Sequence, residues 1–400
     1  SVLEAISDSV KANIPLSNNG KKGKVVAGWS EEVKHFQLEA KFWFNCWVSA
    51  GRPNNNDLHW AMKHSKNQYH YSVRRAKKNE ASIRNNKFIQ CCLNRDTDNL
   101  LKEVKKLNGI KCKNSTTIDG KVVDDNIAAH FSDLYEGLYN SVISDDALRN
   151  LLDEINNDIS NEALSDIDKV TPSLIKEAVG NLKNNKSDVE YDWKSDGFIH
   201  GIEALASPLA FIFKAFLIHG HIYKKLLTCA LSPIVKDSNG DIAASKNYRA
   251  IAISSLILKI FDICIIILIG HLLSNDELQY GFQKNCSTLQ CTWAVQETVS
   301  HYLRNGSEIF ACLLDFSKAF DKVNFKMLFE KLIERKIPFI FLRLLLYIYM
   351  KQTCYVKWNS RKSASFAVKN GVRQGAILSP TLFCAYLDVL LKKLRNSGLG

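Results

Sequence analysis

Six apolar or small residues in a row, Ile309 to Leu314, end at a carboxylate, Asp315. Such a run predicts a strand covered on both faces, because a half-exposed strand would alternate apolar and polar residues. Residues 325–333 then follow helical spacing, and Asp321 or Asn324 can cap the start of that helix. Asp315 is therefore expected at a strand-to-helix corner, either as a cap or turn residue or as a metal ligand.

A second group of residues, NGVRQGAILSP, occupies 370–380. Its two glycines, Gly371 and Gly375, flank Gln374 and allow the backbone to approach a planar or phosphorylated ligand closely. Ser379 and Pro380 then start a helix, since serine caps and proline at the first helical position both favour initiation. A β-hairpin made of 353–358 and 363–368 is predicted to lead into this turn.

A third group consists of SPIVK at 232–236 and the segment 246–251, which carries Lys246 and Arg249. A lysine supplies a point charge and an arginine a planar fork, and together they suit a triphosphate. The alternative is that Lys236 and Arg249 are two surface cations on a hairpin.

In order and spacing, five blocks resemble the motifs of LINE-type (non-LTR) reverse transcriptases: SPIVK, NYRAIAISSLILKIFD, QYGFQKNCST, LLDFSKAFDKV and NGVRQGAILSP. The resemblance covers about 171–400 and extends more weakly into 29–113. It implies an α+β right-hand polymerase, with fingers at 171–300 and a partial palm at 301–400. A helical, basic linker or arm at 1–113 and an acidic helical connector at 114–170 would precede them.

The resemblance also implies roles for individual residues. Asp315 and the backbone carbonyl of Phe316 would face two Mg²⁺ ions, and Phe320 would be the gate beneath the sugar of the incoming dNTP. Lys236 and Arg249 would hold the triphosphate, while Gln374 and Gly375 would pack beside the nucleotide and template. The family's aspartate pair is expected shortly after Gly400, so the 400-residue chain is expected to lack polymerase activity by itself.

Three positions depart from the family pattern. Ala250 replaces a usual proline, Asn285 replaces a usual glycine, and 186–192 reads KSDVEYD where the family loop is often rich in glycine. None of these changes removes a predicted catalytic group, but they bear on the geometry of the fingers.

Charge is segregated along the chain, whose formal net charge is +12. Residues 60–113 hold 14 Lys and Arg against 4 Asp and Glu, whereas 119–170 hold 3 against 13. The change predicts a boundary near 114–120 and makes polyanions expected partners, namely an RNA template and a DNA primer. Six cations lie on one predicted helix and either bind RNA or keep a spacer helix soluble: Lys63, Lys66, Arg74, Arg75, Lys77 and Lys78.

Composition also bears on the cellular compartment and on association with membranes. The 11 cysteines include no CxxC pair, which favours free thiols without disulfide partners in an intracellular compartment, nucleus or cytoplasm. The apolar runs 263–269 and 337–350 are shorter or more interrupted than the roughly 18 residues of a membrane helix, so we expect core helices and no membrane partner. No targeting signal is recognisable, and an internal piece of a longer polyprotein is expected.

Three functions remain open at this level. In the first, the parent protein is an RNA-directed DNA polymerase, and this chain forms its fingers and half of its palm. Alternatively, the chain is a catalytically inactive nucleic-acid-binding remnant. The third possibility is a decayed copy of a retrotransposon.

Overall fold

The computed structural model describes residues 31–94, 96, 99, 115–141, 145–159, 163–189, 193–283 and 285–398. The described residues form two compact units that divide near residue 114: a smaller unit at 31–94 and a larger one at 115–398. Each unit is described by itself below. The helical, basic linker expected at 1–113 lies partly outside the described residues, at 1–30, 95, 97, 98 and 100–113.

The described residues of the smaller unit contain helices α2 (Glu31–Ser49), α3 (Asp57–Lys78) and α4 (Glu80–Leu93). The side chain of Asn56 caps α3 by accepting a hydrogen bond from the His59 amide at 2.9 Å. Helix α3 packs on α2 through the small buried residues Ser65, Ser72 and Ala76, whose helical spacing places them along one seam. Helical spacing of apolar residues at 33–47 and 58–76 accounts for α2 and α3.

A mixed sheet forms the centre of the larger unit. Its strand order is β2 (Tyr248–Ile253), β1 (Thr228–Val235), β3 (Thr353–Trp358) and β4 (Arg361–Lys362), and β5 (Phe366–Ala367) also pairs with β3. Strand β1 runs antiparallel to β2 and parallel to β3, with Cys229 beside Cys354. The hairpin predicted at 353–368 is confirmed, with Asn359 in the left-handed region at φ 50° in its turn.

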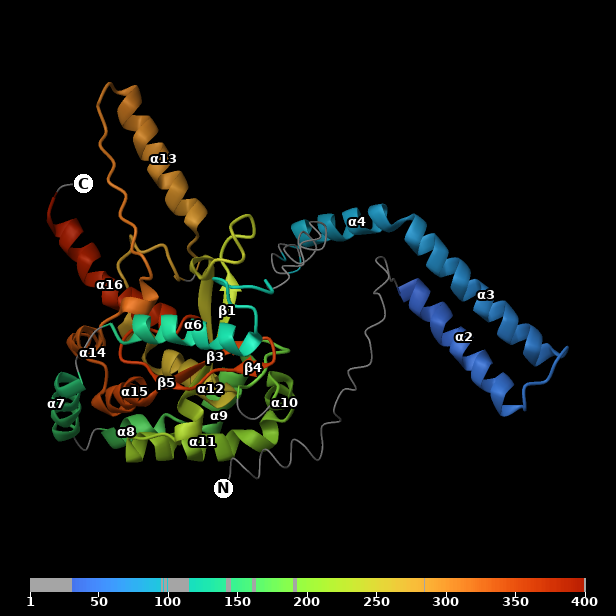
Figure 1. Ribbon diagram of the computed structural model, residues 1–400, viewed down its shortest axis with the longest axis horizontal. Helices are drawn as coiled ribbons and strands as arrows, with labels where there is room; N and C mark the ends of the chain where they lie inside the picture. The colour runs from blue at the N-terminus through green and yellow to red at the C-terminus, as the bar shows by residue number, and fades with distance from the viewer. Residues whose placement is uncertain are drawn as a thin grey trace. The chain divides into compact units, whose positions relative to one another are not determined.

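Helices cover the sheet in layers (Figure 1), and the core of the unit lies between them. Helix α6 packs on β3, α9 packs on α11 and α12, and α15 contacts α7, α11 and α14. The helix bounds are α6 (Asp124–Tyr139), α7 (Asp145–Asn157), α8 (Ala163–Asp168), α9 (Pro172–Gly180), α10 (Ser195–His200), α11 (Ile202–His219), α12 (Leu256–Ile269), α13 (Thr288–Arg304), α14 (Phe325–Glu334), α15 (Phe339–Lys351) and α16 (Ser379–Asn396). The fold is therefore a mixture of helices and a sheet, as the α+β prediction requires.

Local capping explains where several helices begin. The Thr171 side chain accepts a hydrogen bond from the Leu174 amide at the start of α9, and Pro172 occupies the first turn. Asn324 caps α14 in the same way through the Met327 amide. The Asn324 cap and the proline in the first turn of α16 agree with the sequence prediction.

The strand predicted at 309–314 is wrong for this structure. Residues 307–316 adopt no regular structure, and Phe310 and Leu313 are 92% and 95% exposed. A strand needs a neighbour for its backbone N–H and C=O groups, and none of the described strands pairs with this segment. Its apolar side chains consequently find no surface to cover them, although the sequence has the composition of a buried strand.

Two segments, 202–219 and 256–273, are long and apolar enough to cross a bilayer by length and composition. The second is largely buried inside the larger unit, where α12 packs on α9. The first, α11, contacts α9 and α15. Core helices have the same composition, and this packing fits the predicted role of 263–269 as a core helix.

Candidate functional site

A cleft of about 890 Å³ lies in the larger unit beside the β1–β2 hairpin. Its walls come from α6, that hairpin, the loop at Phe282, the segment 315–321 and the turn at 374–380. Seven residues predicted from sequence line this single cleft: Lys236, Arg249, Asp315, Phe316, Phe320, Gln374 and Gly375. The fold thus brings them together from positions up to 139 residues apart in sequence, although their individual roles remain predictions.

One wall of the cleft is cationic. The register of the hairpin pairs Ile234 with Arg249, so Lys236 and Arg249 project near the same end of β1 and β2. The Lys236 amide donates to the Asn247 carbonyl at 2.7 Å, and its Nζ donates to the Lys246 carbonyl at 2.8 Å. Both predicted cations are exposed, and Lys246 and Lys318 also line the cleft. This wall can attract a phosphorylated ligand.

Phe320 belongs to an aromatic stack. Its ring lies 4.4 Å from that of Phe383 at 19°, and 5.7 Å from that of Phe282 at 75°. Rings in stacked and edge-to-face pairs attract each other beyond their apolar burial. Phe320 is therefore held in one place on the cleft wall by a ring from α16 and a ring from the loop 274–283.

The turn at 370–375 approaches two other backbones closely. At Gly371, with φ +90°, an added Cβ would lie 2.6 Å from the Asp321 carbonyl oxygen. At Gly375, with φ +108°, it would lie 2.8 Å from the Ala252 carbonyl oxygen. The Gln374 carbonyl accepts from the Ala252 amide at 2.6 Å, which fixes the turn against β2. Only glycine combines these φ values with this lack of space.

Asp315 is the exposed carboxylate of the cleft, while Asp321 is buried and hydrogen-bonded. Among the described residues, no group of three or more His, Cys, Asp or Glu side chains is arranged to hold a metal ion. One or two carboxylates suffice for Mg²⁺ when substrate phosphates and water supply the other ligands. Asp315 and the backbone oxygen of Phe316 fit part of such an oxygen ligand set.

Helix α6 contributes a buried junction that the sequence did not predict. The Tyr139 hydroxyl donates to Asp321 Oδ1 at 2.9 Å. Asn370, fully buried, donates through Nδ2 to the Asp321 carbonyl at 2.7 Å and to the Leu138 carbonyl at 3.0 Å. The Val372 amide donates to the Phe320 carbonyl at 2.8 Å. These bonds connect α6, the Phe320 corner and the Gln374 turn.

The junction perturbs both of its titratable groups. Burial raises the pKa of Asp321, although the Tyr139 hydrogen bond and the charges of Lys318 and Lys236 act in the opposite direction. Burial raises the pKa of Tyr139 well above its usual value, and the Asp321 charge adds to the effect. The tyrosine therefore stays protonated and remains the donor.

Tyr139→Phe should lower the free energy of unfolding by about 1–3 kcal/mol, because it leaves a buried carboxylate without its donor. Tyr135→Phe is the matched control: Tyr135 lies one turn earlier on α6, and its buried hydroxyl has no hydrogen-bond partner among the described residues. Urea denaturation of both variants measures the difference. Equal effects would show that the Tyr139–Asp321 bond contributes nothing to stability.

Asp321→Asn tests the charge of the junction separately. A carboxyl group whose pKa is raised by folding stabilises the fold below its unfolded pKa, about 3.9, and this contribution disappears as the pH rises through the folded pKa. Wild type should therefore lose stability relative to Asp321→Asn as the pH rises above about 4, because the folded pKa lies above the unfolded one. Denaturation curves from acid to neutral pH test the sign, and a constant difference would contradict a raised pKa.

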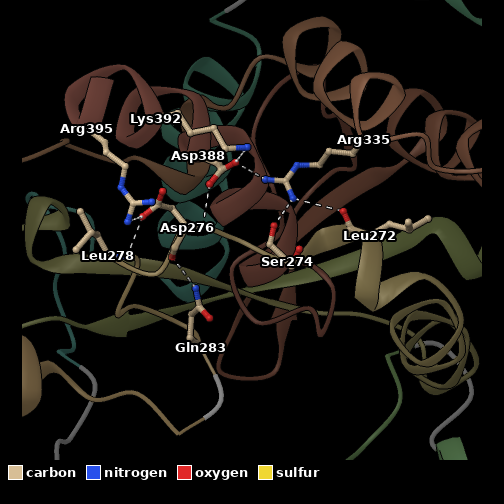
Figure 2. A network of polar contacts seen from close by, with 9 residues as sticks. All are labelled: Leu272, Ser274, Asp276, Leu278, Gln283, Arg335, Asp388, Lys392 and Arg395. Atoms are coloured by element: carbon tan, nitrogen blue, oxygen red, sulfur yellow. Dashed lines mark hydrogen bonds and ion pairs between the residues drawn. The ribbon is translucent and has the colours of Figure 1, made fainter. Parts of the chain in front are cut away.

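An ion-pair network fixes the loop that carries Phe282 (Figure 2). Asp388 on α16 accepts from Arg335 at 2.8 Å, from Lys392 at 2.7 Å and from the Asp276 amide at 3.0 Å. The Asp276 side chain in turn binds Arg395 at 3.0 Å. The start of the loop is thus attached to α16, the same helix that supplies Phe383 to the aromatic stack.

The six cations predicted to bind nucleic acid lie on α3, in the smaller unit. All six side chains are exposed: Lys63, Lys66, Arg74, Arg75, Lys77 and Lys78. They form no part of the cleft, and their affinity for RNA remains a prediction.

Sequence reasoning missed the contribution of the acidic segment, which supplies Leu134, Tyr135 and Leu138 to the cleft wall. Phe282 was also missed, and Lys246 was noted without being assigned to the site. A signal for α6 was present, because Ile127, Phe131 and Tyr135 repeat every four residues and are buried. Arg373, which precedes the cleft residue Gln374, instead points into the core, where its Nη1 lies 3.7 Å from Cys229 Sγ.

Two comparisons show which known proteins part of this chain resembles. Residues 234–398 match the family described as reverse transcriptase (RNA-dependent DNA polymerase). The chain is also 24% identical over 188 residues to the Retrovirus-related Pol polyprotein from type-1 retrotransposable element R2 of Nasonia vitripennis. The match covers 47% of this chain and 18% of that relative, so it spans about a fifth of the relative's length.

Proposed function

We propose that this chain, whose residues 234–398 are a reverse transcriptase domain of the LINE type, forms the nucleotide-binding part of a polymerase that copies RNA into DNA. The observation that carries the proposal is the cleft. Residues from five separate segments line it, and they are the types that a nucleotide requires: two cations, a carboxylate, an aromatic ring and a glycine turn. In this proposal 171–300 form the fingers and 301–400 part of the palm.

Lys236 and Arg249 would bind the triphosphate of the incoming dNTP. The two cations lie at the end of one hairpin, so they can neutralise adjacent phosphates while leaving the rest of the cleft open. Phosphoryl transfer depends mainly on such positioning and on stabilising charge at phosphorus. Gln374 and Gly375, fixed against β2, would border the base of the nucleotide and the RNA template.

Reverse transcriptases use divalent metal ions, and we propose Mg²⁺ held in part by Asp315 and the carbonyl oxygen of Phe316. When bound, such ions activate the attacking hydroxyl and neutralise the leaving pyrophosphate. The exposure of Asp315 suits this role, because its oxygens are free to face an ion rather than a buried partner. Asp321 would instead keep the Phe320 corner in place through Tyr139.

A second candidate function is nucleic-acid binding without catalysis. Two observations favour it: the cleft holds one exposed carboxylate, Asp315, and the apolar segment 309–314 before it pairs with no described strand. A polypeptide in this state would bind RNA through its basic surfaces but could not fix two divalent ions by itself. The free thiols among the described residues suit an intracellular location for either function.

Phe320→Ala should relax discrimination against ribonucleotides, measured in a polypeptide that also carries the expected aspartate pair. The Phe320 ring is held by Phe282 and Phe383, so it forms a rigid wall that a 2′-hydroxyl would meet. Removing that wall should lower the ratio of dNTP to rNTP incorporation about 10- to 200-fold, the range for a pocket contact of this size.

The matched control for this experiment is Phe316→Ala, which removes an exposed ring from the same cleft outside the stack. It preserves the backbone carbonyl assigned to the metal and should leave the ratio unchanged. Primer extension with each nucleotide pool gives both ratios. If Phe320→Ala left the ratio unchanged as well, the assignment of Phe320 as the gate would be wrong.

A further inference from the structure

The smaller unit carries a groove of about 670 Å³ along α3, bordered by Phe36 of α2. On α3 it is lined by aromatic, amide and guanidinium groups, namely His64, Asn67, Gln68, Tyr71 and Arg74. This combination offers ring faces, hydrogen-bonding edges and positive charge in one place. A purely apolar ligand would leave the amides without partners, and a simple anion would not use the rings.

Two aromatic side chains on α3 face the solvent. Trp60 is 67% and Tyr71 is 70% exposed, and the Trp60 ring stacks on His64 at 4.8 Å and 10°. Residues 60, 64, 67, 71 and 74 are separated by three or four positions, so they follow one face of the helix. That face lies beside the seam of Ser65 and Ser72 that packs on α2, which leaves the rings open along its edge.

The same helix carries six cations against one acidic residue, Asp57. Lys63 and Lys66 flank His64 in sequence, and Arg74 lines the groove itself. The complementary ligand must therefore combine regularly spaced negative charge with flat apolar faces. Single-stranded nucleic acid has both, whereas a duplex hides its base faces and an acidic peptide has few of them.

We propose that this face of α3 is a base-stacking site for single-stranded RNA. Trp60 with His64 forms one platform and Tyr71 forms a second, while Arg74 and the neighbouring lysines follow the phosphates. At about 1.5 Å per residue the platforms are about 16 Å apart, so they contact bases separated along the strand. The identity of the strand as RNA rests on the proposed function. The stacking itself rests on the groove lined by His64 and Tyr71, and on the exposed Trp60 ring that stacks on His64 beside it.

The test uses the full 400-residue chain and two fluorescein-labelled 16-nucleotide probes, oligo(A) and an abasic strand with the same number of phosphates. Trp60→Ala and Tyr71→Ala should each weaken oligo(A) binding about 5- to 150-fold, the effect of losing one stacked base. Binding of the abasic strand should stay unchanged, because its phosphates still meet the same cations. Trp60→Phe should restore most of the affinity.

Two control variants separate stacking from charge and from exposed aromatic surface in general. Phe42→Ala removes a 59% exposed ring of α2 that, unlike Tyr71, does not line the groove and, unlike Trp60, does not stack on a residue that does; it should change the binding of neither probe. Replacing all six α3 cations with glutamine should flatten the slope of log affinity against log salt by about 3 to 4 if four to six of them contact phosphates, at about 0.7 per phosphate. The variant with six glutamines should still bind oligo(A) more tightly than the abasic strand.

Three results would overturn the inference. Wild type could bind both probes equally, Trp60→Ala and Tyr71→Ala could bind oligo(A) as wild type does, or duplex RNA could lose as much affinity as oligo(A) in both variants. None of these concerns the cleft of the larger unit. The polymerase proposal is judged separately by primer extension with Phe320→Ala and Asp315→Ala.

Discussion

Replacing Asp315 with alanine should lower nucleotidyl transfer at least about 10³-fold, while the free energy of unfolding stays within about 0.5 kcal/mol of wild type. The activity loss follows from the proposed metal site, since a metal ion contributes several kcal/mol of charge stabilisation in the transition state. The unchanged stability follows from the exposure of Asp315 on a segment without regular structure. The combination distinguishes a catalytic carboxylate from a cap or turn residue.

The measurement is primer extension on an RNA template, in a polypeptide that includes the aspartate pair expected after Gly400, together with urea denaturation. Glu308→Ala is the control: Glu308 is an exposed acidic residue of the same segment that does not line the cleft. It should retain wild-type activity. Activity of Asp315→Ala above about a tenth of wild type would contradict the metal-ligand role.

Local signals in the sequence predicted the helices well because each start depends on residues within a few positions. Thr171 and Asn324 cap helices through amides three residues later, so sequence spacing alone determines the contact. The hairpin at β3 also depends on short-range pairing around Asn359. These elements form the scaffold on which the cleft residues are held.

The segment 309–314 shows where local signals fail. Its composition is that of a doubly covered strand, but composition does not reveal whether a partner strand is within reach. In this structure it is exposed and unpaired. We expect it to become a strand in a polypeptide that supplies a neighbour, and hydrogen exchange of its amides would report that pairing.

The cleft itself was predicted in part. The resemblance to LINE-type enzymes identified seven residues that line it, but it assigned no site chemistry to the acidic segment. The Tyr139–Asp321 bond joins residues 182 positions apart, and such a contact has no signature in spacing or periodicity. Phe282 was missed for the same reason, because its proximity to Phe320 depends on how the loop 274–283 is attached to α16.

Among single changes in the network that attaches loop 274–283 to α16, Asp388→Ala should be the most destabilising. It should lower the free energy of unfolding by about 2–4 kcal/mol. Asp388 is 3% and Arg335 14% exposed, so the substitution leaves a largely buried guanidinium without its carboxylate. This loss of stability should be smaller than for a completely buried ion pair, because Arg335 still donates to the Ser274 carbonyl at 2.6 Å. Loosening the 274–283 loop should also weaken nucleotide binding, since Phe282 then no longer supports Phe320.

Lys392→Ala is the matched control, because it removes the other ion-pair partner of the same carboxylate. Lys392 is 62% exposed, and an exposed pair of this kind contributes about 0–1 kcal/mol. Urea denaturation at neutral pH should therefore separate the two variants clearly. Equal destabilisation by Asp388→Ala and Lys392→Ala would contradict this prediction. It would show that leaving the largely buried Arg335 without its carboxylate costs no more than losing an exposed ion pair.

The pH dependence provides an independent check on the Asp388 variant. Burial raises the pKa of Asp388, but the Lys392 and Asp276 hydrogen bonds and the Arg335 charge outweigh it, so the net pKa is lowered. A carboxyl group of this kind stabilises the fold above its unfolded pKa, about 3.9, and loses that contribution as the pH falls through the folded value. The stability difference between wild type and Asp388→Ala should therefore be constant near neutrality and shrink below about pH 4. A difference that persisted unchanged in acid would show that the carboxylate acts by shape and packing rather than by its charge on Arg335.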